Sequence, residues 1–376
     1  MKKLRPLSLI CFLFFLTSCA QYHGPEIQNE QSPKYIAKPI IEGIDIPWGM
    51  DFISQDEMLV TEKSGILYRV SDGNKTEVSG LPEVYVRGQG GLLDVAIAPS
   101  FETSKLVFFT TSSTDGEGPG GHTALYSAQL KGDTLVNLKQ LYKGEENSKK
   151  GQHWGSRIAF DNNGFIYFSI GDRGNREVNP QDITRDGGKI YRLNQDGSIP
   201  TSNPFFNEKE SKKAIYSYGH RNPQGMSKHP ETGAIWIHEH GPRGGDEINI
   251  IGAGKNYGWP KITYGINYSG TPITNDQDLP GLEQPFYYWI PSIAPSGMAF
   301  VSSDNYPKWK DNLLVGSLKF EYLELLVIEN NKVKERHKVL EGIGRIRNVK
   351  QGPDGLIYIG VEGKGILKII PKTPLN

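Results

Sequence analysis

The sequence contains GILYRV at residues 65–70 and repeats its pattern three more times, as GFIYFS (164–169), GAIWIH (233–238) and GLIYIG (355–360). In each stretch a glycine, which permits a tight turn, precedes alternating aliphatic and aromatic residues that suit a half-buried strand. The four glycines lie 99, 69 and 122 residues apart. A repeat of about 50 to 60 residues fits these gaps as two, one and two units. The pattern therefore predicts a chain built from repeated β units.

The sequence between these stretches favours turns over helices. Asp-Gly or Asn-Gly pairs separate apolar runs at 72–73, 163–164, 196–197 and 354–355, and the chain has 44 glycines and 24 prolines. No segment of about 12 residues or more shows clear helical periodicity. About 340 residues at this repeat length correspond to about six units. We therefore predict an all-β fold, a six-bladed β-propeller with four-stranded antiparallel blades.

Charge and composition exclude two classes of protein. The 376 residues carry 42 Lys and Arg against 42 Asp and Glu, so the formal net charge is +0. This balance argues against nucleic acid as a partner. Hydrophobic residues make up 37% of the chain, which is enough to form a core and argues against disorder.

The first 18 residues have the features of a bacterial signal peptide. Three basic residues precede an apolar run at 7–16, which is too short to span a membrane as an ordinary helix. The run ends in LTSC (16–19), which resembles a lipoprotein cleavage site with Cys19 as the acylated residue. The alternative is a plain cleaved signal peptide with an incidental Cys19.

These features predict a signal peptide at 1–18, a polar tether at 19–36 and a single propeller domain at 37–376. The protein is then an exported lipoprotein of the cell envelope, on the periplasm-facing membrane. Its only membrane contact would be the lipid on Cys19. Because Cys11 is removed with the prefix, the exported domain would have no disulfide.

Polar side chains gather in glycine-rich phrases that read as loops. These are RGQGGL (87–92), GQHWG (151–155), GDRGN (171–175), GHRNPQG (219–225), EHGPRGGDE (239–247), GSLK (316–319) and GRIRN (344–348). Glycine lets the backbone approach a ligand closely, and the polar side chains would converge if these loops share one rim of the fold.

The phrases at 219–225 and 239–247, followed by NYGWP (256–260), resemble the soluble PQQ-dependent sugar dehydrogenases, in particular their aldose sugar dehydrogenase branch. The resemblance covers about residues 40–372. It implies a six-bladed propeller with pyrroloquinoline quinone (PQQ) and Ca2+ at one mouth. It also implies oxidation of an aldose sugar at C1 to a lactone, with hydride transfer to PQQ and then to an electron acceptor that the sequence does not identify.

The resemblance makes His153 the general base and Asp172 the carboxylate beside it. An imidazole titrates near neutrality, so it can accept the proton of an anomeric hydroxyl. A carboxylate bound to the imidazole would set its tautomer and raise its basicity. The alternatives are a structural histidine and a turn aspartate.

PQQ has three carboxylates, which call for cations and hydrogen-bond donors. The resemblance assigns its contacts to Gln89, Arg221, Asn222, Tyr268, Leu318, Lys319, Arg345, Ile346 and Arg347. Arg345 and Arg347 alternate, so both would point to one face of a strand. The alternative is an ordinary solvated strand face.

Calcium prefers hard oxygen ligands, including backbone carbonyls. The resemblance assigns the carbonyls of Gly241 and Pro242 to the calcium beside the cofactor. Glu247, with the backbone of Tyr257, resembles a second, structural calcium site, and the alternative for Glu247 is a surface charge. Asp246 and His240 take substrate positions. The glucose branch carries glutamine where this chain has His240, so the chain fits the aldose branch better.

The sequence allows three other interpretations. His238 and His240 lie on one face of a strand, where they would be placed to hold zinc with Asp246. A non-catalytic calcium-stabilised propeller that binds carbohydrate or a protein partner is the alternative function. A lactonase-type hydrolase is the weakest reading, because no convincing carboxylate and amide cage for calcium is present.

Overall fold

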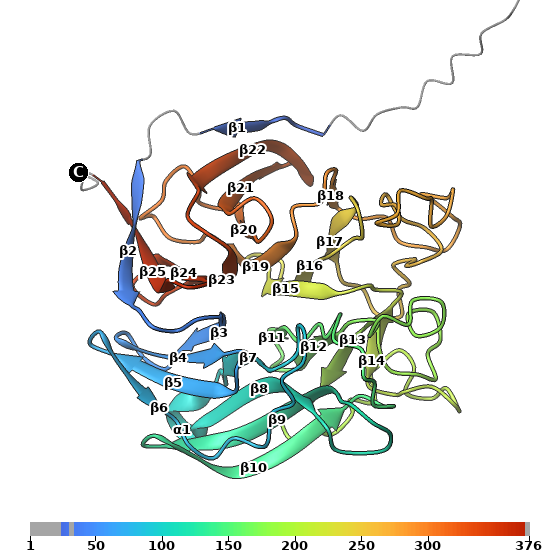
Figure 1. Ribbon diagram of the computed structural model, residues 1–376, viewed down its shortest axis with the longest axis horizontal. Helices are drawn as coiled ribbons and strands as arrows, with labels where there is room; N and C mark the ends of the chain where they lie inside the picture. Colours follow the sequence, from blue (N-terminus) through green and yellow to red (C-terminus); the bar gives the residue numbers. More distant parts are fainter. Residues whose placement is uncertain (1–23, 30–33, 373–376) are drawn as a thin grey trace, which may run out of the picture.

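The computed structural model describes residues 24–29 and 34–372, whose strands form six sheets around a central channel (Figure 1). Each sheet is a four-stranded antiparallel blade, and blade 5 carries one additional parallel strand. The predicted all-β, six-bladed propeller is therefore confirmed.

The first three blades follow one another along the chain. Blade 1 contains β3 (Pro47–Phe52), β4 (Glu57–Glu62), β5 (Ile66–Ser71) and β6 (Asn74–Glu77). Blade 2 contains β7 (Leu92–Ile97), β8 (Leu106–Ser113), β9 (His122–Lys131) and β10 (Thr134–Lys143), with the short helix α1 (Phe101–Ser104) between its first two strands. Blade 3 contains β11 (Ile158–Phe160), β12 (Ile166–Ile170), β13 (Lys189–Leu193) and β14 (Ile215–Tyr218).

The last three blades complete the ring. Blade 4 contains β15 (Pro223–Lys228), β16 (Ile235–Glu239), β17 (Asp246–Ile250) and β18 (Tyr287–Trp289). Blade 5 contains β19 (Pro295–Phe300), β20 (Leu313–Ser317), β21 (Tyr322–Glu329), β22 (Lys332–Glu341) and the parallel strand β1 (Ile27–Asn29). Blade 6 contains β23 (Ile346–Gln351), β24 (Ile357–Val361), β25 (Gly365–Pro371) and, from the N-terminal side of the chain, β2 (Tyr35–Ile41).

The ring closes where β2 pairs with β25 in antiparallel register, from Tyr35 opposite Pro371 to Ile41 opposite Ile366. The first and last parts of the propeller thus share one sheet, which holds the circle together. Hydrophobic clusters lie between neighbouring blades, as where Phe108 and Leu125 of blade 2 pack with Phe168 and Tyr191 of blade 3. Burial of these facing surfaces provides the main stabilisation of the ring.

The four repeated stretches do not all occupy the same place in a blade. The stretches at 164–169, 233–238 and 355–360 contain β12, β16 and β24, which are second strands, whereas the stretch at 65–70 forms β5, a third strand. The spacings of 69 and 122 residues therefore measure one and two blades. The spacing of 99 residues joins a third strand to a second strand, so it does not correspond to a whole number of blades. Such turn-strand phrases recur within a blade as well as between blades.

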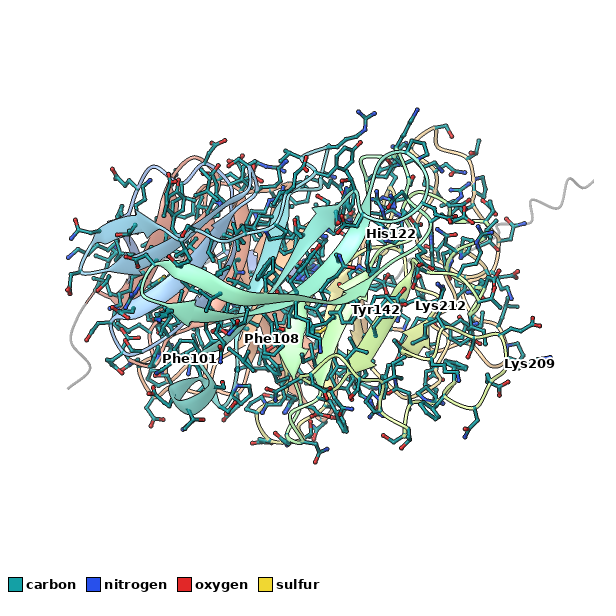
Figure 2. The ribbon with its side chains drawn as sticks, turned by 90° about the horizontal axis from the view of Figure 1, so that it is seen from below. Phe101, Phe108, His122, Tyr142, Lys209 and Lys212 are labelled. Atoms are coloured by element: carbon teal, nitrogen blue, oxygen red, sulfur yellow. The ribbon has the colours of Figure 1, made fainter. Side chains whose placement is uncertain are left out.

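Strand register places several polar loops at one end of the channel. The innermost strand of each blade begins opposite the end of the second strand, as where Pro223 pairs with Glu239 and Ile346 pairs with Val361. Segments that precede innermost strands and segments that follow second strands therefore meet at the same end, which we call the upper mouth. In Figure 2 it faces upward: His122, which begins β9, lies toward that side, and Phe101 of α1 lies toward the opposite side.

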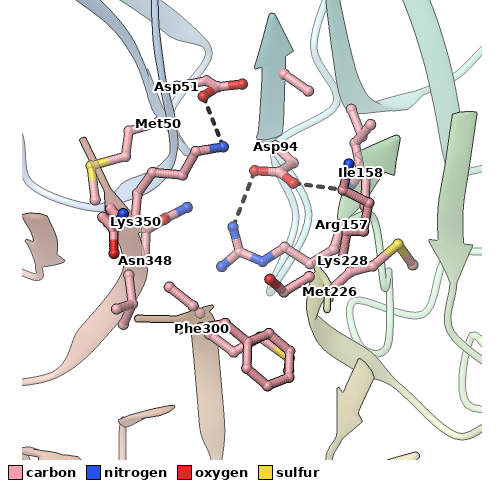
Figure 3. Close-up of a pocket in the computed structure, with 18 of the residues that line it drawn as sticks. Met50, Asp51, Asp94, Arg157, Ile158, Met226, Lys228, Phe300, Asn348 and Lys350 are labelled. Carbon is pink, nitrogen blue, oxygen red and sulfur yellow. Dashed lines mark hydrogen bonds and ion pairs between the residues drawn. The ribbon is translucent and has the colours of Figure 1, made fainter. Parts of the chain in front are cut away.

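The opposite half of the channel contains a cavity of about 380 Å³ that is lined by residues from all six innermost strands (Figure 3). Two ion pairs line it, whereas Lys228 donates to the amide oxygen of Asn162 at 2.8 Å. Lys350 Nζ lies 2.8 Å from Asp51 Oδ1, and Arg157 Nη1 lies 3.1 Å from Asp94 Oδ1.

Arg157 also links blades across the channel axis. Its guanidinium donates to the carbonyls of Trp48 and Gln224 at 3.0 and 2.8 Å. A third carbonyl, that of Arg347, accepts at 2.6 Å. Together with Asp94, these contacts join five of the six blades through one side chain, because each partner belongs to a different blade.

Part of the predicted tether is paired with the sheets. Ile27 packs against the core cluster beside β22, and β1 pairs in parallel with β22. Tyr35 is buried, and its ring centroid lies 4.1 Å from that of Trp309. Residues 27–29 and 35–36 thus belong to blades 5 and 6, because the side chains of Ile27 and Tyr35 pack against neighbours that the sequence does not reveal.

The predicted signal peptide and Cys19 lie outside the described residues, so export and lipid attachment stay predictions. Within residues 24–29 and 34–372, no helix has the length and apolar character needed to cross a membrane.

Candidate active site

A cavity of about 450 Å³ opens at the upper mouth, between the loops of blades 3 and 4. Its wall includes His153, Asp172, Arg221, Pro242, Trp259 and Tyr268. The structure thus brings together residues from sequence phrases that are more than 100 positions apart. Tyr268 is an open part of this wall, with 74% of its surface exposed.

His153 and Asp172 form a close pair on this wall. His153 Nδ1 lies 2.6 Å from Asp172 Oδ1, and the backbone N–H of His153 donates to Gln89 Oε1 at 2.8 Å. Asp172 is held from two further sides, because the N–H of Gly174 and Nε1 of Trp259 donate to its oxygens at 2.7 and 2.9 Å. Since Nδ1 donates to the carboxylate, Nε2 is left as the acceptor, and it has no hydrogen-bond partner within the described part of the chain.

Electrostatics keep this pair in the neutral imidazole and ionised carboxylate state. Burial, and then the charge of Arg221, lower the pKa of His153 even though Asp172 acts to raise it. Burial opposes ionisation of Asp172, but its hydrogen bond with His153 and the nearby charge of Arg221 outweigh that cost, so its pKa is lowered. Such a pair is suited to accepting a proton at Nε2.

The backbone around this pair depends on glycine. A Cβ on Gly171 would lie 2.5 Å from the carbonyl oxygen of His153, and a Cβ on Gly155 would lie 2.7 Å from the backbone nitrogen of Gly171. The phrases at 151–155 and 171–175 therefore pack against each other only because these positions lack side chains. His153 itself has φ of 56°, in the left-handed region that is uncommon for residues other than glycine.

Arg345 and Arg347 reach the same carboxylate. Arg345 Nε and Arg347 Nε each lie 2.6 Å from one oxygen of Glu362. Arg345 Nη1 donates to the carbonyl of Leu318 at 2.9 Å, whereas the terminal nitrogens of Arg347 have no hydrogen-bond partner among the described residues. The two guanidiniums therefore share one anion, Glu362, although Arg345 precedes β23 and only Arg347 lies on that strand.

The side chain of Arg221, which precedes β15, is held by the loop that follows β16. Its Nη1 donates to the carbonyls of His240 and Gly241, both at 2.9 Å. Gly241 must be glycine here, because a Cβ would lie 2.2 Å from the carbonyl oxygen of Gly245. The carbonyl predicted to bind calcium is thus already an acceptor, although a carbonyl oxygen has a second lone pair for a metal ion.

The predicted substrate residues Asp246 and His240 are not placed on the wall beside His153. Asp246 is fully buried, and its two oxygens accept from the backbone N–H groups of Gly241 and Ala294, both at 2.8 Å. His240 Nε2 lies 2.7 Å from the carbonyl oxygen of Pro295. Both side chains stabilise the loops of the upper mouth.

A zinc site formed by His238, His240 and Asp246 is not supported. Across residues 24–29 and 34–372, no group of three or more His, Cys, Asp or Glu side chains is arranged to hold a metal ion. His238 is buried with Nε2 3.3 Å from the carbonyl of Gly297, and Asp246 is engaged by backbone donors.

The remaining predicted cofactor residues differ in accessibility. Asn222 is buried, and its Oδ1 accepts from the N–H of Gly155 at 3.1 Å, while Nδ2 is a buried donor without a partner among the described residues. Leu318 and Ile346 are buried, whereas Lys319 is exposed beside Phe320.

Glu247 is half-buried and lies beside the buried carboxylate of Glu239. Desolvation and the neighbouring Glu239 raise the pKa of Glu247 to about 8. Asn249 Nδ2 donates to both carboxylates, at 3.1 and 3.3 Å, and its Oδ1 has no partner in the described structure. A cavity of about 10 Å³ adjoins Glu239, Glu247 and Tyr257, which is roughly the space of one water or ion. Two facing carboxylates with a spare amide oxygen are a donor set suited to a hard divalent cation.

Sequence reasoning missed Lys63, Glu362 and Trp259. Lys63 donates to the carbonyl of Gly88 at 2.9 Å, and burial and then the charge of Arg347 lower its pKa. Lys63 and Glu362 directly follow β4 and β24, the second strands of blades 1 and 6. Asp172, His240 and Lys319 follow second strands as well, but this shared position is visible only once the strand pairing is known.

The chain is similar to known proteins over almost its whole length. The sequence profile of the glucose/sorbosone dehydrogenase family matches residues 44–368. The aldose sugar dehydrogenase YliI of Escherichia coli is 40% identical over 340 residues, which cover 88% of this chain and 91% of the relative.

Two solved structures are similar along almost their whole length. The apo form of the soluble aldose sugar dehydrogenase of Escherichia coli has a TM-score of 0.85 and 37% identity, covering 90% of this chain and 100% of that one. The PQQ-bound aldose sugar dehydrogenase of Streptomyces coelicolor has a TM-score of 0.73 and 26% identity, covering 90% and 99%.

Proposed function

Because the chain belongs to the glucose/sorbosone dehydrogenase family, we propose that it is a PQQ-dependent sugar dehydrogenase that oxidises aldoses at C1 to lactones. The observation that carries the proposal is the His153–Asp172 pair, at 2.6 Å, on the wall of a 450 Å³ cavity that Arg221 also lines. The family relation supplies the reaction class, and this pair supplies the base that the reaction needs.

The chain's own residues provide the proton transfer. Asp172 holds the Nδ1–H of His153, so Nε2 accepts the proton of the C1 hydroxyl as the C1–H bond breaks. The ionised carboxylate then stabilises the imidazolium. When bound, PQQ would supply the two-electron acceptor for the hydride from C1, and calcium would supply Lewis-acid polarisation of the cofactor.

Several groups at the upper mouth fit a tricarboxylate cofactor. The terminal nitrogens of Arg347 are free of partners among the described residues, and Asn222 Nδ2 is a buried donor without an acceptor. Arg345 is held by Glu362 next to Arg347, and Lys319 adds an exposed cation. We propose that these residues bind PQQ carboxylates and that Glu362 orients the two guanidiniums by engaging their Nε atoms.

We further propose two calcium sites. The carbonyls of Gly241 and Pro242 would hold the ion beside the cofactor. Glu247, with the Tyr257 backbone, would hold a structural ion, and the structure adds Glu239 as a candidate ligand because it adjoins the same small cavity. In both cases hard oxygen donors support calcium rather than a softer metal.

Reconstitution tests the function directly. Purified protein should reduce a dye in an aldose-dependent manner only after addition of both PQQ and calcium. Either component alone should leave the rate near background. Absence of PQQ binding, together with no activity across a broad aldose panel, would refute the proposal.

Calcium should raise the melting temperature more at pH 8 than at pH 5. Without the ion, the raised pKa of Glu247 means that its contribution to stability is full below about pH 4.5 and is lost as pH rises through about 8. Calcium binds the ionised carboxylate, so it restores stability where that loss is greatest. At about 100 times its Kd, an ion adds about 2.7 kcal/mol.

Calorimetric or fluorescence melting with and without calcium measures this effect, and Glu247→Gln is the matched control. The Gln variant should lose most of the pH dependence of calcium stabilisation. An equal calcium effect in wild type and variant at both pH values would remove Glu247 from the site.

A further inference from the structure

Arg173 is a buried cation directly behind the catalytic pair. It follows Asp172 in the chain, and only 1% of its surface is exposed. Unlike Arg157, which pairs with Asp94, it makes no ion pair with a carboxylate in the described part of the structure. Its Nε has no hydrogen-bond partner there either. Burying a guanidinium without a carboxylate partner costs free energy, so its remaining contacts must offset that cost.

The shorter of those contacts go to the segment that carries His153, and a longer one of 3.5 Å goes from Nη2 to the carbonyl of Gly121. Arg173 Nη1 donates to the carbonyl of Gln152, and Nη2 donates to the carbonyl of Lys150 at 2.8 Å. The guanidinium carbon lies 3.4 Å from the ring centroid of Trp154. Arg173 therefore contacts the residues on both sides of His153 without contacting its imidazole.

The backbone of His153 needs such support. Its φ of 56° lies in a region where a side chain other than glycine is disfavoured, so the surrounding structure must hold it there. Asp172 holds the imidazole through Nδ1. The adjacent residue, Arg173, holds the two flanking residues through its fork of donors and its stacked plane.

We propose that Arg173 is a positioning residue for His153, fixing the backbone segment 150–154 so that Nε2 points into the 450 Å³ cavity. The proposal rests on the proposed function in one respect, namely that His153 is the base. It assigns to the Asp-Arg pair at 172–173 a joint action, in which the carboxylate sets the tautomer and the guanidinium sets the position.

Arg173 acts on His153 through its charge as well as through its hydrogen bonds and its stacking. The charged and titratable groups around this imidazole are Asp172, Arg173, Arg221 and His240. After burial, Arg221 and Arg173 lower the pKa of His153, and Asp172 raises it. Burial lowers the pKa of Arg173 itself to about 9, so it is still protonated at neutral pH.

The sign of the expected pH effect follows from these charges. The base must be neutral to accept a proton, so activity falls as pH drops through the pKa of His153. Loss of the positive charge at 173 raises that pKa, which moves the acid limb of kcat/KM to higher pH. Loss of the forked geometry alone lowers kcat and leaves the limb in place.

Arg173→Gln and Arg173→Lys separate the two effects. We expect the Gln variant to raise the pKa of His153 and to lower kcat by about 10- to 100-fold, as for a small misplacement of a catalytic group. The Lys variant should keep the wild-type pKa, because the charge stays, but lose a similar factor in kcat. Arg185→Gln is the control, because Arg185 lies in the same connection between β12 and β13 and pairs with Glu146 at the surface.

The pKa of His153 is measured by NMR titration of cofactor-free protein, and kcat after reconstitution. Folded Gln and Lys variants with wild-type titration and wild-type kcat would overturn the proposal. If the Gln variant does not fold, the Lys variant decides, since wild-type kcat in it has the same consequence. An inactive wild type would instead count against the proposed function, while the titration would still report whether residue 173 acts on His153.

Discussion

His153→Ala is expected to lower kcat for aldose oxidation by about 10²- to 10⁴-fold, the usual contribution of a positioned general base, while PQQ still binds. The imidazole is the group at the cavity wall whose Nε2 is left as an acceptor, because Nδ1 is held 2.6 Å from Asp172. Alanine removes the proton acceptor but leaves the cations of the upper mouth unchanged. Single-turnover kinetics and PQQ titration of the same preparation measure both quantities.

His337→Ala is a suitable control for this experiment. His337 lies on β22, the fourth strand of blade 5, and pairs with Glu335 at 2.8 Å, so its loss leaves the upper mouth intact. Its kcat should match that of the wild type. Wild-type turnover in the His153 variant would exclude His153 from the mechanism.

Arg347→Met should weaken PQQ binding by about 10- to 100-fold, which corresponds to the roughly 1.5–3 kcal/mol of a charge-assisted hydrogen bond. The terminal nitrogens of Arg347 have no partner among the described residues, so a ligand carboxylate can take both. Methionine preserves much of the side-chain volume but removes the charge. Glu362 keeps Arg345 as a partner in this variant, at 2.6 Å.

Lys350→Met is the matched control, since Lys350 lies on the same strand, β23, and faces the cavity in the other half of the channel, where it pairs with Asp51. Isothermal titration with PQQ and calcium should give wild-type affinity for this control. Equal affinities for the Arg347 variant and the control would show that the cofactor is bound elsewhere.

The fold was predictable because its signals are local. Alternating apolar and aromatic residues after a glycine specify a strand within six residues, and their recurrence specifies a repeated unit. The position of each strand within its blade was harder to predict from the sequence. GILYRV (65–70) and GLIYIG (355–360) look alike in sequence, yet one is a third strand and the other a second strand, since only pairing with neighbouring strands distinguishes them.

The residues of the candidate site also divide into those that the sequence identified and those that it did not. His153, Asp172 and Arg221 could be named from glycine-rich phrases and a family resemblance, and the structure brings them to one cavity. Glu362 and Lys63 could not, because neither lies in such a phrase. Asp246 was named as a substrate residue, but its neighbours in space are backbone donors of two loops.

The amino-acid sequence by itself determined the strand-and-turn repeat, the polar loops and the residue types available for proton transfer and anion binding, because each depends on residues close together in the chain. Only the tertiary structure decided which charges meet. The bridge from Glu362 to Arg345 and Arg347, the grip of Arg173 on the His153 segment and the contact of Arg157 with the carbonyl of Arg347, 190 positions away, all form across turns or blades. Their energies depend on burial and on distances of a few ångströms, which arise when the ring of blades closes.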